Sequence, residues 1–275
     1  DVVEINDYVT PEIDRVCRGN RKIGLGVMGL ADALFELGIA YDSEPALDFA
    51  RKAAALLVEE AFAASEALAR ERGKFPNYAG STWEARGRPM RNAAVTTVAP
   101  TGTLSILAAT SGGIEPAFAL AFYRHILDGA ELVDVDAPFR RFAERRGIWT
   151  EDLGRRLADG QPLCELAELP ESEMRVFVTA QEIAPIWHVR MQAAFQEHID
   201  GAISKTINLP RSASPQDVAD VYRLAYELGC KGVTVYREGC RPGQPMGHEA
   251  TTSHCPQCHR PIATEAGSCS RCPWC

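Results

Sequence analysis

The stretch that decides the fold reads VTTVAPTGTLSIL and spans residues 95–107. Its β-branched beginning, residues 95–98, is typical of a short buried strand. Pro100 ends that strand, because proline has no N–H and fixes its own φ. A small polar turn then leads into the apolar residues 104–109, which can begin a helix. The stretch therefore predicts a strand, a tight turn and a helix start in succession.

This succession is well suited to binding an anion, because the first backbone N–H groups of a helix have no partner within the helix. Gly102 would let a ligand approach the backbone closely. The hydroxyls of Thr101, Thr103 and Ser105 can add hydrogen bonds to phosphate oxygens. The alternative is an ordinary turn whose threonines cap the helix.

A second loop, SGGIEP at residues 111–116, follows within about three helical turns. Two glycines and a proline bracket its carboxylate, Glu115, which predicts a fixed loop. Arg91-Asn92-Ala93 precedes this stretch, and TTVAPTGT occupies residues 96–103. Together with the second loop, the whole segment resembles the substrate-phosphate segment of adenosylcobalamin-dependent (class II) ribonucleotide reductases. The resemblance implies that the substrate phosphate is bound by Pro100, Thr101, Gly102, Thr103 and Leu104.

Composition places the 275-residue chain among globular proteins, with 46% hydrophobic and 24% charged residues. Its net charge of −8 argues against broad binding to nucleic acid or to anionic membranes. No apolar run approaches the roughly 20 residues needed to span a bilayer, and no secretory signal opens the chain. We expect a cytoplasmic protein. Because the sequence begins with Asp1 rather than Met, we also expect it to be part of a longer chain.

Gly24, Gly26 and Gly29 match the spacing of the dinucleotide-binding glycines. That motif needs a buried strand before it and an acidic residue after a second strand. The residues before it, 18–22, are polar, and residues 43–72 read as one long helix with Ser43 as N-cap and Gly73 past its end. We therefore expect these glycines to allow close packing, and an NAD-dependent oxidoreductase remains an alternative.

The long helix should bury one face, because apolar residues recur along it at spacings of three and four. Residues 128–170 read as charged and helical, with Cys164 as a small core residue. Residues 185–198 are predicted to form a further helix, with His198 and Met191 on the same helix face. Its two histidines are ten residues apart, which is no metal-binding spacing on a helix.

The last third alternates between helix and strand, with strands at residues 204–209 and 231–237 and a helix that begins at Ser214 between them. Such alternation predicts an α/β fold with a parallel sheet. The resemblance implies that residues 1–242 are the later half of a ten-stranded α/β barrel. A single tyrosine, Tyr236, stands where class I reductases carry a pair for radical transfer.

The C-terminal part divides into a polar linker, residues 243–253, and a cysteine-rich tail, residues 254–275. Two Cys-Pro-x-Cys pairs separated by thirteen residues are typical of a zinc ribbon with four thiolate ligands. The predicted zinc ligands are Cys255, Cys258, Cys272 and Cys275. A redox dithiol is the other interpretation. Class II reductases use a cysteine-rich C-terminus to re-reduce an active-site disulfide, so both roles can coexist, with Cys269 as a redox thiol.

The resemblance also implies an activity, the thiyl-radical reduction of ribonucleotides to 2′-deoxyribonucleotides for DNA synthesis. The expected enzyme is an adenosylcobalamin-dependent ribonucleoside-diphosphate reductase. The implied partners are a ribonucleotide substrate, a deoxynucleotide effector bound upstream, a thioredoxin-type reductant and a second copy of the chain. The family's radical-cysteine loop, Asn-Pro-Cys-Gly-Glu, is absent from this sequence. We therefore expect the radical cysteine upstream and the 275-residue chain alone to be inactive. A non-enzymatic zinc-ribbon binding protein is the main alternative, although its tail carries few basic residues.

Overall fold

Parallel pairing of extended segments organises the chain in the computed structural model, which describes residues 2–125, 131–240, 253–254 and 261–262. Leu25 forms a parallel bridge with Thr96, and Val98 forms one with Ile203. Strand β3 (Thr206–Leu209) continues from there and pairs in parallel with β4 (Thr234–Arg237), with Thr206 opposite Thr234. The spatial order of these segments therefore follows the order of the chain.

The strand predicted at residues 95–98 is present only as isolated bridges at Thr96 and Val98. Two backbone donors of this segment are bound by a side chain instead of by a neighbouring strand. The Asp200 carboxylate accepts hydrogen bonds from the backbone N–H groups of Val95 (2.8 Å) and Thr96 (3.4 Å). Those two donors are therefore occupied by a carboxylate, and the continuous ladder pattern of a strand does not develop there.

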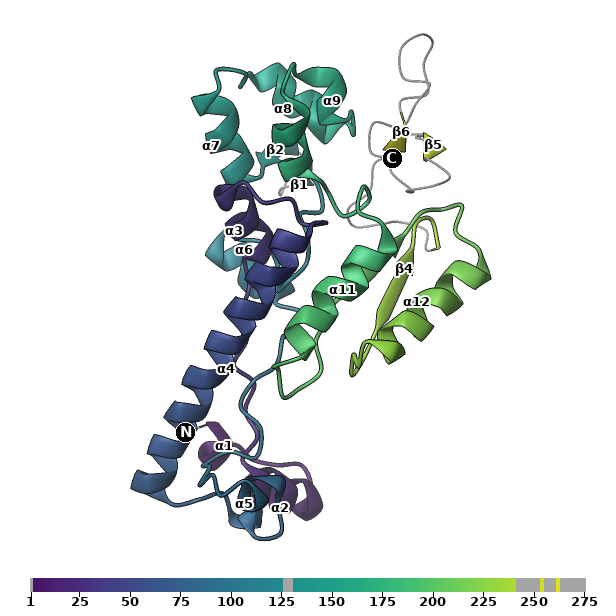
Figure 1. The fold of residues 1–275 in the computed structure, drawn as a ribbon. Coiled ribbons are helices and arrows are strands. Elements are labelled where there is room, and N and C mark those ends of the chain that lie inside the picture. Colours follow the sequence, from purple (N-terminus) through teal and green to yellow (C-terminus); the bar gives the residue numbers. More distant parts are fainter. Residues whose placement is uncertain (1, 126–130, 241–252, 255–260, 263–275) are drawn as a thin grey trace.

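Helices connect the parallel segments, as an α/β fold requires. Helices α3 (Leu30–Leu37) and α4 (Glu44–Arg72) follow the first segment, α6 (Gly102–Ala108) follows the second, and α12 (Pro215–Glu227) joins β3 to β4. Helix α11 (Pro185–Gln196) precedes the third segment and packs against α4 (Figure 1). The α/β class is thus confirmed, while the count of ten strands stays a prediction.

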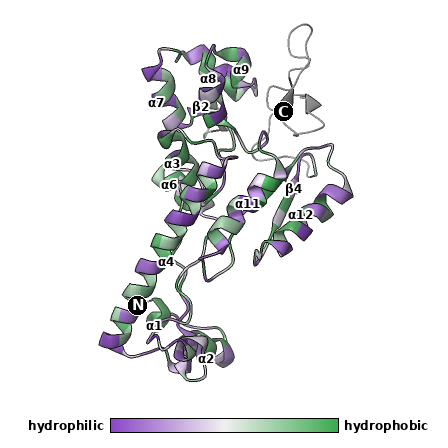
Figure 2. Cartoon of the chain, in the orientation of Figure 1, coloured by the Kyte–Doolittle hydropathy of each residue, from purple (hydrophilic) through white to green (hydrophobic). Residues whose placement is uncertain are grey.

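Helix α4 matches its sequence pattern closely. The Ser43 hydroxyl accepts a hydrogen bond from Ala46 N (3.3 Å), and Gly73 follows the last turn with φ +82°. Figure 2 shows hydrophilic and hydrophobic residues alternating along it. The apolar spacing predicts a buried face that includes Ala61 and Ala64, but the buried stripe runs through Ala61 and then Ser65, and Ala64 is exposed. The stripe drifts by one residue because 3.6 residues make a turn.

The segment after residue 120 contains a β-hairpin that we did not predict. Strands β1 (Ala121–His125) and β2 (Glu131–Val135) pair antiparallel, with Ala121 opposite Val135. The charged helical region predicted for residues 128–170 therefore begins only at α7 (Ala137–Arg145). It continues through α8 (Glu151–Ala158) and α9 (Leu163–Leu166). Cys164 is exposed, so its assignment to the core was wrong.

Buried apolar side chains gather in separate clusters. One joins α3, α4 and α11 through residues such as Leu34, Leu47 and Phe195, and a second centres on Phe139 and Phe177 beside the hairpin. The strands β3 and β4 pack on α11 and α12 in another. Helix α11 ends at Gln196, so His198 lies beyond it instead of on its predicted face.

The remaining elements are short. They are α1 (Val2–Ile5), α2 (Pro11–Asn20), η1 (Pro76–Tyr78), α5 (Thr82–Ala85), α10 (Glu171–Met174), η3 (Arg175–Phe177), β5 (Ser253–His254) and β6 (Pro261–Ile262). In the ranges that the structure describes, no helix combines the length and the apolar character that a membrane span demands.

Candidate functional site

The predicted phosphate-binding turn lies where the bridging segment at Val98 passes into α6. Thr101 adopts the left-handed conformation with φ 50° and ψ 22°, which is unusual for a β-branched residue. Its carbonyl accepts a hydrogen bond from Ser105 N (2.8 Å) and so starts the helix. Its hydroxyl makes no cap for α6 and instead accepts a hydrogen bond from Gly113 N (2.8 Å). The interpretation of Thr101 as a simple helix-capping residue was therefore wrong.

The backbone at the start of α6 is open to solvent. Pro100, Gly102, Thr103 and Leu104 are exposed, and a Cβ added to Gly102 would meet no atom within 4 Å. The hydroxyls that were predicted to assist are not equally free. The Ser105 hydroxyl donates to Gly102 O (3.1 Å), while Thr103 faces solvent. An anion at this turn would therefore rely on backbone N–H groups and on the Thr103 hydroxyl.

The loop at residues 111–116 packs directly behind this turn. Gly113 has φ +50°, and a Cβ there would lie 3.3 Å from Ala99 O. The loop is also tied to α3, because the Asp32 carboxylate accepts hydrogen bonds from Ser111 N (3.1 Å) and the Thr110 hydroxyl (2.6 Å). The prediction that this glycine-rich loop is fixed is confirmed.

A buried ion pair joins the same loop to β3. The Lys205 side chain is fully buried, and its Nζ donates to Glu115 Oε2 at 2.6 Å and to Thr206 O at 3.0 Å. Glu115 Oε1 accepts a hydrogen bond from Thr206 N (2.6 Å). Burial lowers the pKa of Lys205, and the adjacent Glu115 carboxylate opposes that shift. The ammonium is thus held in the interior by a charge partner and by well-formed hydrogen bonds.

His188 on α11 is the third member of this cluster. Its Nδ1 lies 3.1 Å from Lys205 Nζ, and its Nε2 lies 3.2 Å from Ala180 O. Burial and then the Lys205 charge lower the pKa of His188 well below its usual value, so the ring is neutral. Because a carbonyl can only accept, Nε2 carries the proton and Nδ1 accepts from the ammonium. His188 is therefore a buried histidine with hydrogen-bond partners at both ring nitrogens.

Tyr41 completes the surroundings of the cluster. Its hydroxyl donates to Ile114 O (2.7 Å), and its ring lies 5.7 Å from Lys205 Nζ. Burial and the nearby Glu115 charge raise the pKa of Tyr41 well above its usual value. The phenol therefore remains a neutral donor that holds the loop at Ile114.

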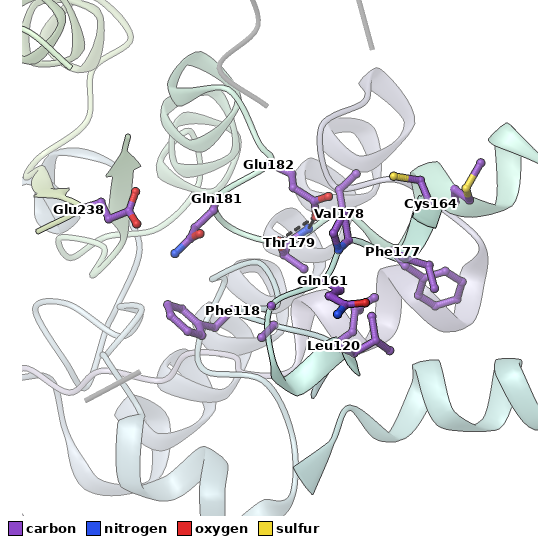
Figure 3. Close-up of a pocket in the computed structure, with 16 residues that line it drawn as sticks. Phe118, Leu120, Gln161, Cys164, Phe177, Val178, Thr179, Gln181, Glu182 and Glu238 are labelled. Atoms are coloured by element: carbon purple, nitrogen blue, oxygen red, sulfur yellow. Dashed lines mark hydrogen bonds between the residues drawn. The ribbon is translucent and has the colours of Figure 1, made fainter. Parts of the chain in front are cut away.

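A pocket of about 100 Å³ is lined in part by Thr179 and Gln181, the chain neighbours of Ala180 (Figure 3). Phe118, Gln161, Gln181 and Glu238 contribute to its lining. Glu182 also lines it, and its carboxylate accepts hydrogen bonds from Thr179 N (2.7 Å) and from the Thr179 hydroxyl (2.8 Å). Burial raises the pKa of Glu182, while the bonds from Thr179 oppose the shift.

Arg91 and Asn92, which belong to the quoted motif, have a structural role at the far end of the strand. Arg91 Nη1 donates to the carbonyls of Arg72 (3.0 Å) and Gly73 (3.1 Å), at the C-terminus of α4. Asn92 is buried, accepts from the Ser65 hydroxyl (2.9 Å) and donates to a backbone carbonyl (2.7 Å). Neither residue joins the phosphate turn.

The glycines that resemble a dinucleotide motif are explained by close packing. A Cβ on Gly26 would lie 2.1 Å from Thr97 O, and one on Gly29 would lie 2.5 Å from the Thr110 hydroxyl oxygen. The space that a cofactor would need above these glycines is therefore filled by the chain itself, as the sequence context predicted.

The predicted zinc ligands Cys255, Cys258, Cys272 and Cys275, and the redox thiol Cys269, lie outside the described residues. Within the described ranges, no group of three or more metal-binding side chains is clustered. Zinc in the tail stays a prediction.

Sequence reasoning did not find the buried cluster around Lys205. The available signal was a lysine within an otherwise apolar and β-branched strand start, ISKTI at residues 203–207, where only a paired charge is tolerated. Its partner, Glu115, had been noted as a bracketed carboxylate, but the two residues are 90 positions apart. No local pattern connects residues at that separation.

Comparison with known proteins gives consistent matches. Residues 1–236 match the family described as "Ribonucleotide reductase, barrel domain". A "Vitamin B12-dependent ribonucleoside-diphosphate reductase" of Thermoplasma acidophilum is 48% identical over 246 residues, which are 90% of this chain and 32% of that protein. The protein of the same description from Mycobacterium tuberculosis is 46% identical over 250 residues, which are 91% of this chain and 35% of that protein.

A solved structure extends the similarity to the fold. The "Actinobacillus ureae class Id ribonucleotide reductase alpha subunit" superposes with a TM-score of 0.71 at 25% sequence identity, over 86% of this chain and 43% of that one. The chain spans about a third of the length of the curated relatives described above.

Proposed function

The chain belongs to the ribonucleotide reductase barrel-domain family, and we propose on this basis that it is part of a ribonucleoside-diphosphate reductase. The reaction replaces the ribose 2′-hydroxyl by hydrogen, so that a ribonucleotide becomes a 2′-deoxyribonucleotide and water leaves. Two electrons enter from a pair of cysteine thiols, which become a disulfide. Both close relatives carry reductase names at 46–48% identity, which supports this assignment.

The observation that carries the proposal is the open turn at residues 100–104, held from behind by residues 111–116. The substrate phosphate would be bound by backbone N–H groups at Gly102, Thr103 and Leu104, with the Thr103 hydroxyl as a further donor. The exposed Gly102 leaves room for the phosphate oxygens to approach. Pro100 and Thr101 would fix the direction of the turn.

The relatives' names extend the proposal to adenosylcobalamin as the source of the radical. The described residues do not show where that cofactor would bind. The pocket beside Ala180, at about 100 Å³, is well below the ~300–1,000 Å³ of usual ligand pockets, and no histidine lines it. We therefore assign no residue of this chain to the cofactor and derive no step from it.

The remaining parts of the proposal concern regions beyond the described residues. The radical cysteine and the deoxynucleotide effector site would belong to another part of the enzyme, and the enzyme would act as a cytoplasmic homodimer. Cys255, Cys258, Cys272 and Cys275 would hold zinc, or with Cys269 would pass electrons from a thioredoxin-type reductant to the active-site disulfide. The zinc proposal predicts about one bound metal ion per chain by elemental analysis.

An activity assay of the full-length gene product tests the proposal. Cytidine diphosphate, adenosylcobalamin and a dithiol are supplied, and deoxycytidine diphosphate is measured. Product that depends on both the cobalamin and the dithiol is expected, and the 275-residue chain alone should give none. Absence of product from the full-length protein under these conditions, or turnover by the 275-residue chain alone, would contradict the proposal.

A further inference from the structure

The cluster of Lys205, Glu115 and His188 is not explained by packing alone. The Lys205 ammonium has three donors, and all three are used: toward Glu115 Oε2, Thr206 O and His188 Nδ1, at 2.6 to 3.1 Å. Removing a charged amine from water is costly, and apolar side chains of similar volume often give equal stability. A buried lysine at this place therefore calls for a role beyond filling the core.

The position of the cluster suggests that role, because its members come from separate segments of the chain. Lys205 precedes β3, His188 lies on α11, and Glu115 lies in the loop that backs the phosphate turn. Through His188 the cluster also reaches Ala180 O, and the chain neighbours of Ala180, Thr179 and Gln181, line the pocket described above. Lys205 thus connects β3 to the loop that backs the phosphate turn and, through His188, to the segment at Ala180.

A short path of hydrogen bonds leads from Lys205 to the phosphate turn. Both carboxylate oxygens of Glu115 are engaged, one by Lys205 and the other by Thr206 N (2.6 Å). Two residues earlier, Gly113 N donates to the Thr101 hydroxyl (2.8 Å). Thr101 is held in the left-handed conformation, which a β-branched residue does not adopt without support.

We propose that Lys205 is a positioning residue for substrate phosphate: it holds Glu115, and thereby the loop whose Gly113 fixes Thr101 and the N–H groups of the phosphate turn. This inference rests on the proposed phosphate site at residues 100–104. Lys205 itself does not touch substrate, because its side chain is fully buried. Its effect is on the direction in which the backbone donors of α6 point.

The test measures binding of cytidine diphosphate to the full-length gene product by calorimetry, together with hydrogen exchange of the Gly113 amide. The variants are Lys205→Met, Glu115→Gln and the double variant. Ser65→Ala is the control, since Ser65 is buried and hydrogen-bonded to Asn92 at the far end of α4. It should lower stability without reaching the phosphate turn.

Lys205→Met should weaken diphosphate binding by about tenfold or more and should speed exchange at Gly113, while Ser65→Ala leaves both unchanged. Glu115→Gln, which keeps the side-chain shape, should act in the same direction. The double variant should regain unfolding stability, because no unpaired carboxylate charge remains, and should still bind weakly because no ammonium holds residue 115.

Each contrary result has its own meaning. Wild-type affinity in Lys205→Met would overturn the positioning role and leave the phosphate site standing. Recovery of affinity along with stability in the double variant would also overturn it, because the effect would then be one of stability alone. If the wild-type protein does not bind cytidine diphosphate, the proposed phosphate site fails and the positioning role fails with it.

Discussion

Replacing Gly26 by alanine should destabilise the fold at the first parallel bridge. The added Cβ would lie 2.1 Å from Thr97 O and 3.2 Å from Thr97 C, both backbone atoms that no rotamer change can move. Normal contacts need more than about 3 Å, so the two segments would have to separate by about an ångström. That shift would break the hydrogen bonds from Leu25 N to Val95 O (2.8 Å) and from Thr97 N to Leu25 O (3.0 Å).

The size of the effect follows from these contacts. Two backbone hydrogen bonds contribute about 1 kcal/mol each, and overpacking at a tight site costs about 1–3 kcal/mol. The free energy of unfolding should therefore fall by about 3–5 kcal/mol for Gly26→Ala. Urea denaturation followed by circular dichroism measures this difference directly.

Gly232→Ala is the matched control, because a Cβ there would meet no atom within 4 Å and its φ is not in the left-handed region. Its free energy of unfolding should change by less than about 1 kcal/mol. Wild-type stability in Gly26→Ala would refute the close-packing explanation. Unchanged stability combined with loss of NADH binding would instead revive the dinucleotide interpretation of these glycines.

Further predictions concern Asp136, Asp200 and Phe139. Burial, with smaller effects from Asp32 and Glu36, raises the pKa of Asp136 to about 6. An unfolded aspartate has a pKa near 3.9, so the folded protein binds this proton more tightly than the unfolded chain does. The folded protein therefore loses stability as the pH rises from about 4 to 6. Asp136→Asn keeps a good N-cap for α7. In urea titrations this variant should be up to about 3 kcal/mol more stable than wild type at pH 7.5 and equally stable at pH 4. The same difference in stability at both pH values would contradict this prediction. Asp200→Ala should lower the free energy of unfolding by about 1.5–3 kcal/mol, because its carboxylate holds Val95 N and Thr96 N, whereas the exposed Asp220→Ala should change it by about 0.5 kcal/mol or less. Phe139→Ala, in the fully buried centre of its cluster, should cost about 3–5 kcal/mol by thermal unfolding, and a cost under about 1 kcal/mol would mean that this cluster is not a packed core.

Local signals predicted the helices well. Ser43 and Ser214 both cap their helices as expected, and Ser214 forms a capping box with Asp217. These elements depend on residues within one or two turns, so the sequence contains what determines them. The alternation of helix and strand in the last third likewise predicted the parallel pairing of β3 with β4.

Features that depend on distant partners were not predictable. The hairpin of β1 and β2 is the exception, because the sequence between its strands contains Asp128-Gly129, a pair typical of hairpin turns, and the signal was overlooked when residues 128–170 were interpreted as helical. The segment at residues 95–98 forms isolated bridges only, since Asp200, more than 100 residues later, takes two of its donors. The exposure of Cys164 follows from how the helices after the hairpin pack together, which no periodicity reports.

The candidate site was predicted in part. The loops at residues 96–107 and 111–116 were found from their glycines, prolines and threonines, and they do lie together. The Lys205–Glu115 ion pair and the neutral His188 hold these loops. These contacts join residues that are 17 to 90 positions apart in the sequence, so they could not be predicted. The hydrogen bond that the Thr101 hydroxyl accepts from Gly113 N was likewise not predicted.

Titration of cytidine diphosphate into the ¹⁵N-labelled chain, followed by the backbone amide signals, shows most directly whether the phosphate is bound at residues 100–104. The amides of Gly102, Thr103 and Leu104 should shift in a saturable way, because their N–H groups are the proposed donors. Cytidine without phosphates should leave these signals in place. Unchanged signals at these three amides, or equal shifts with cytidine, would contradict the assignment of this turn as the phosphate site.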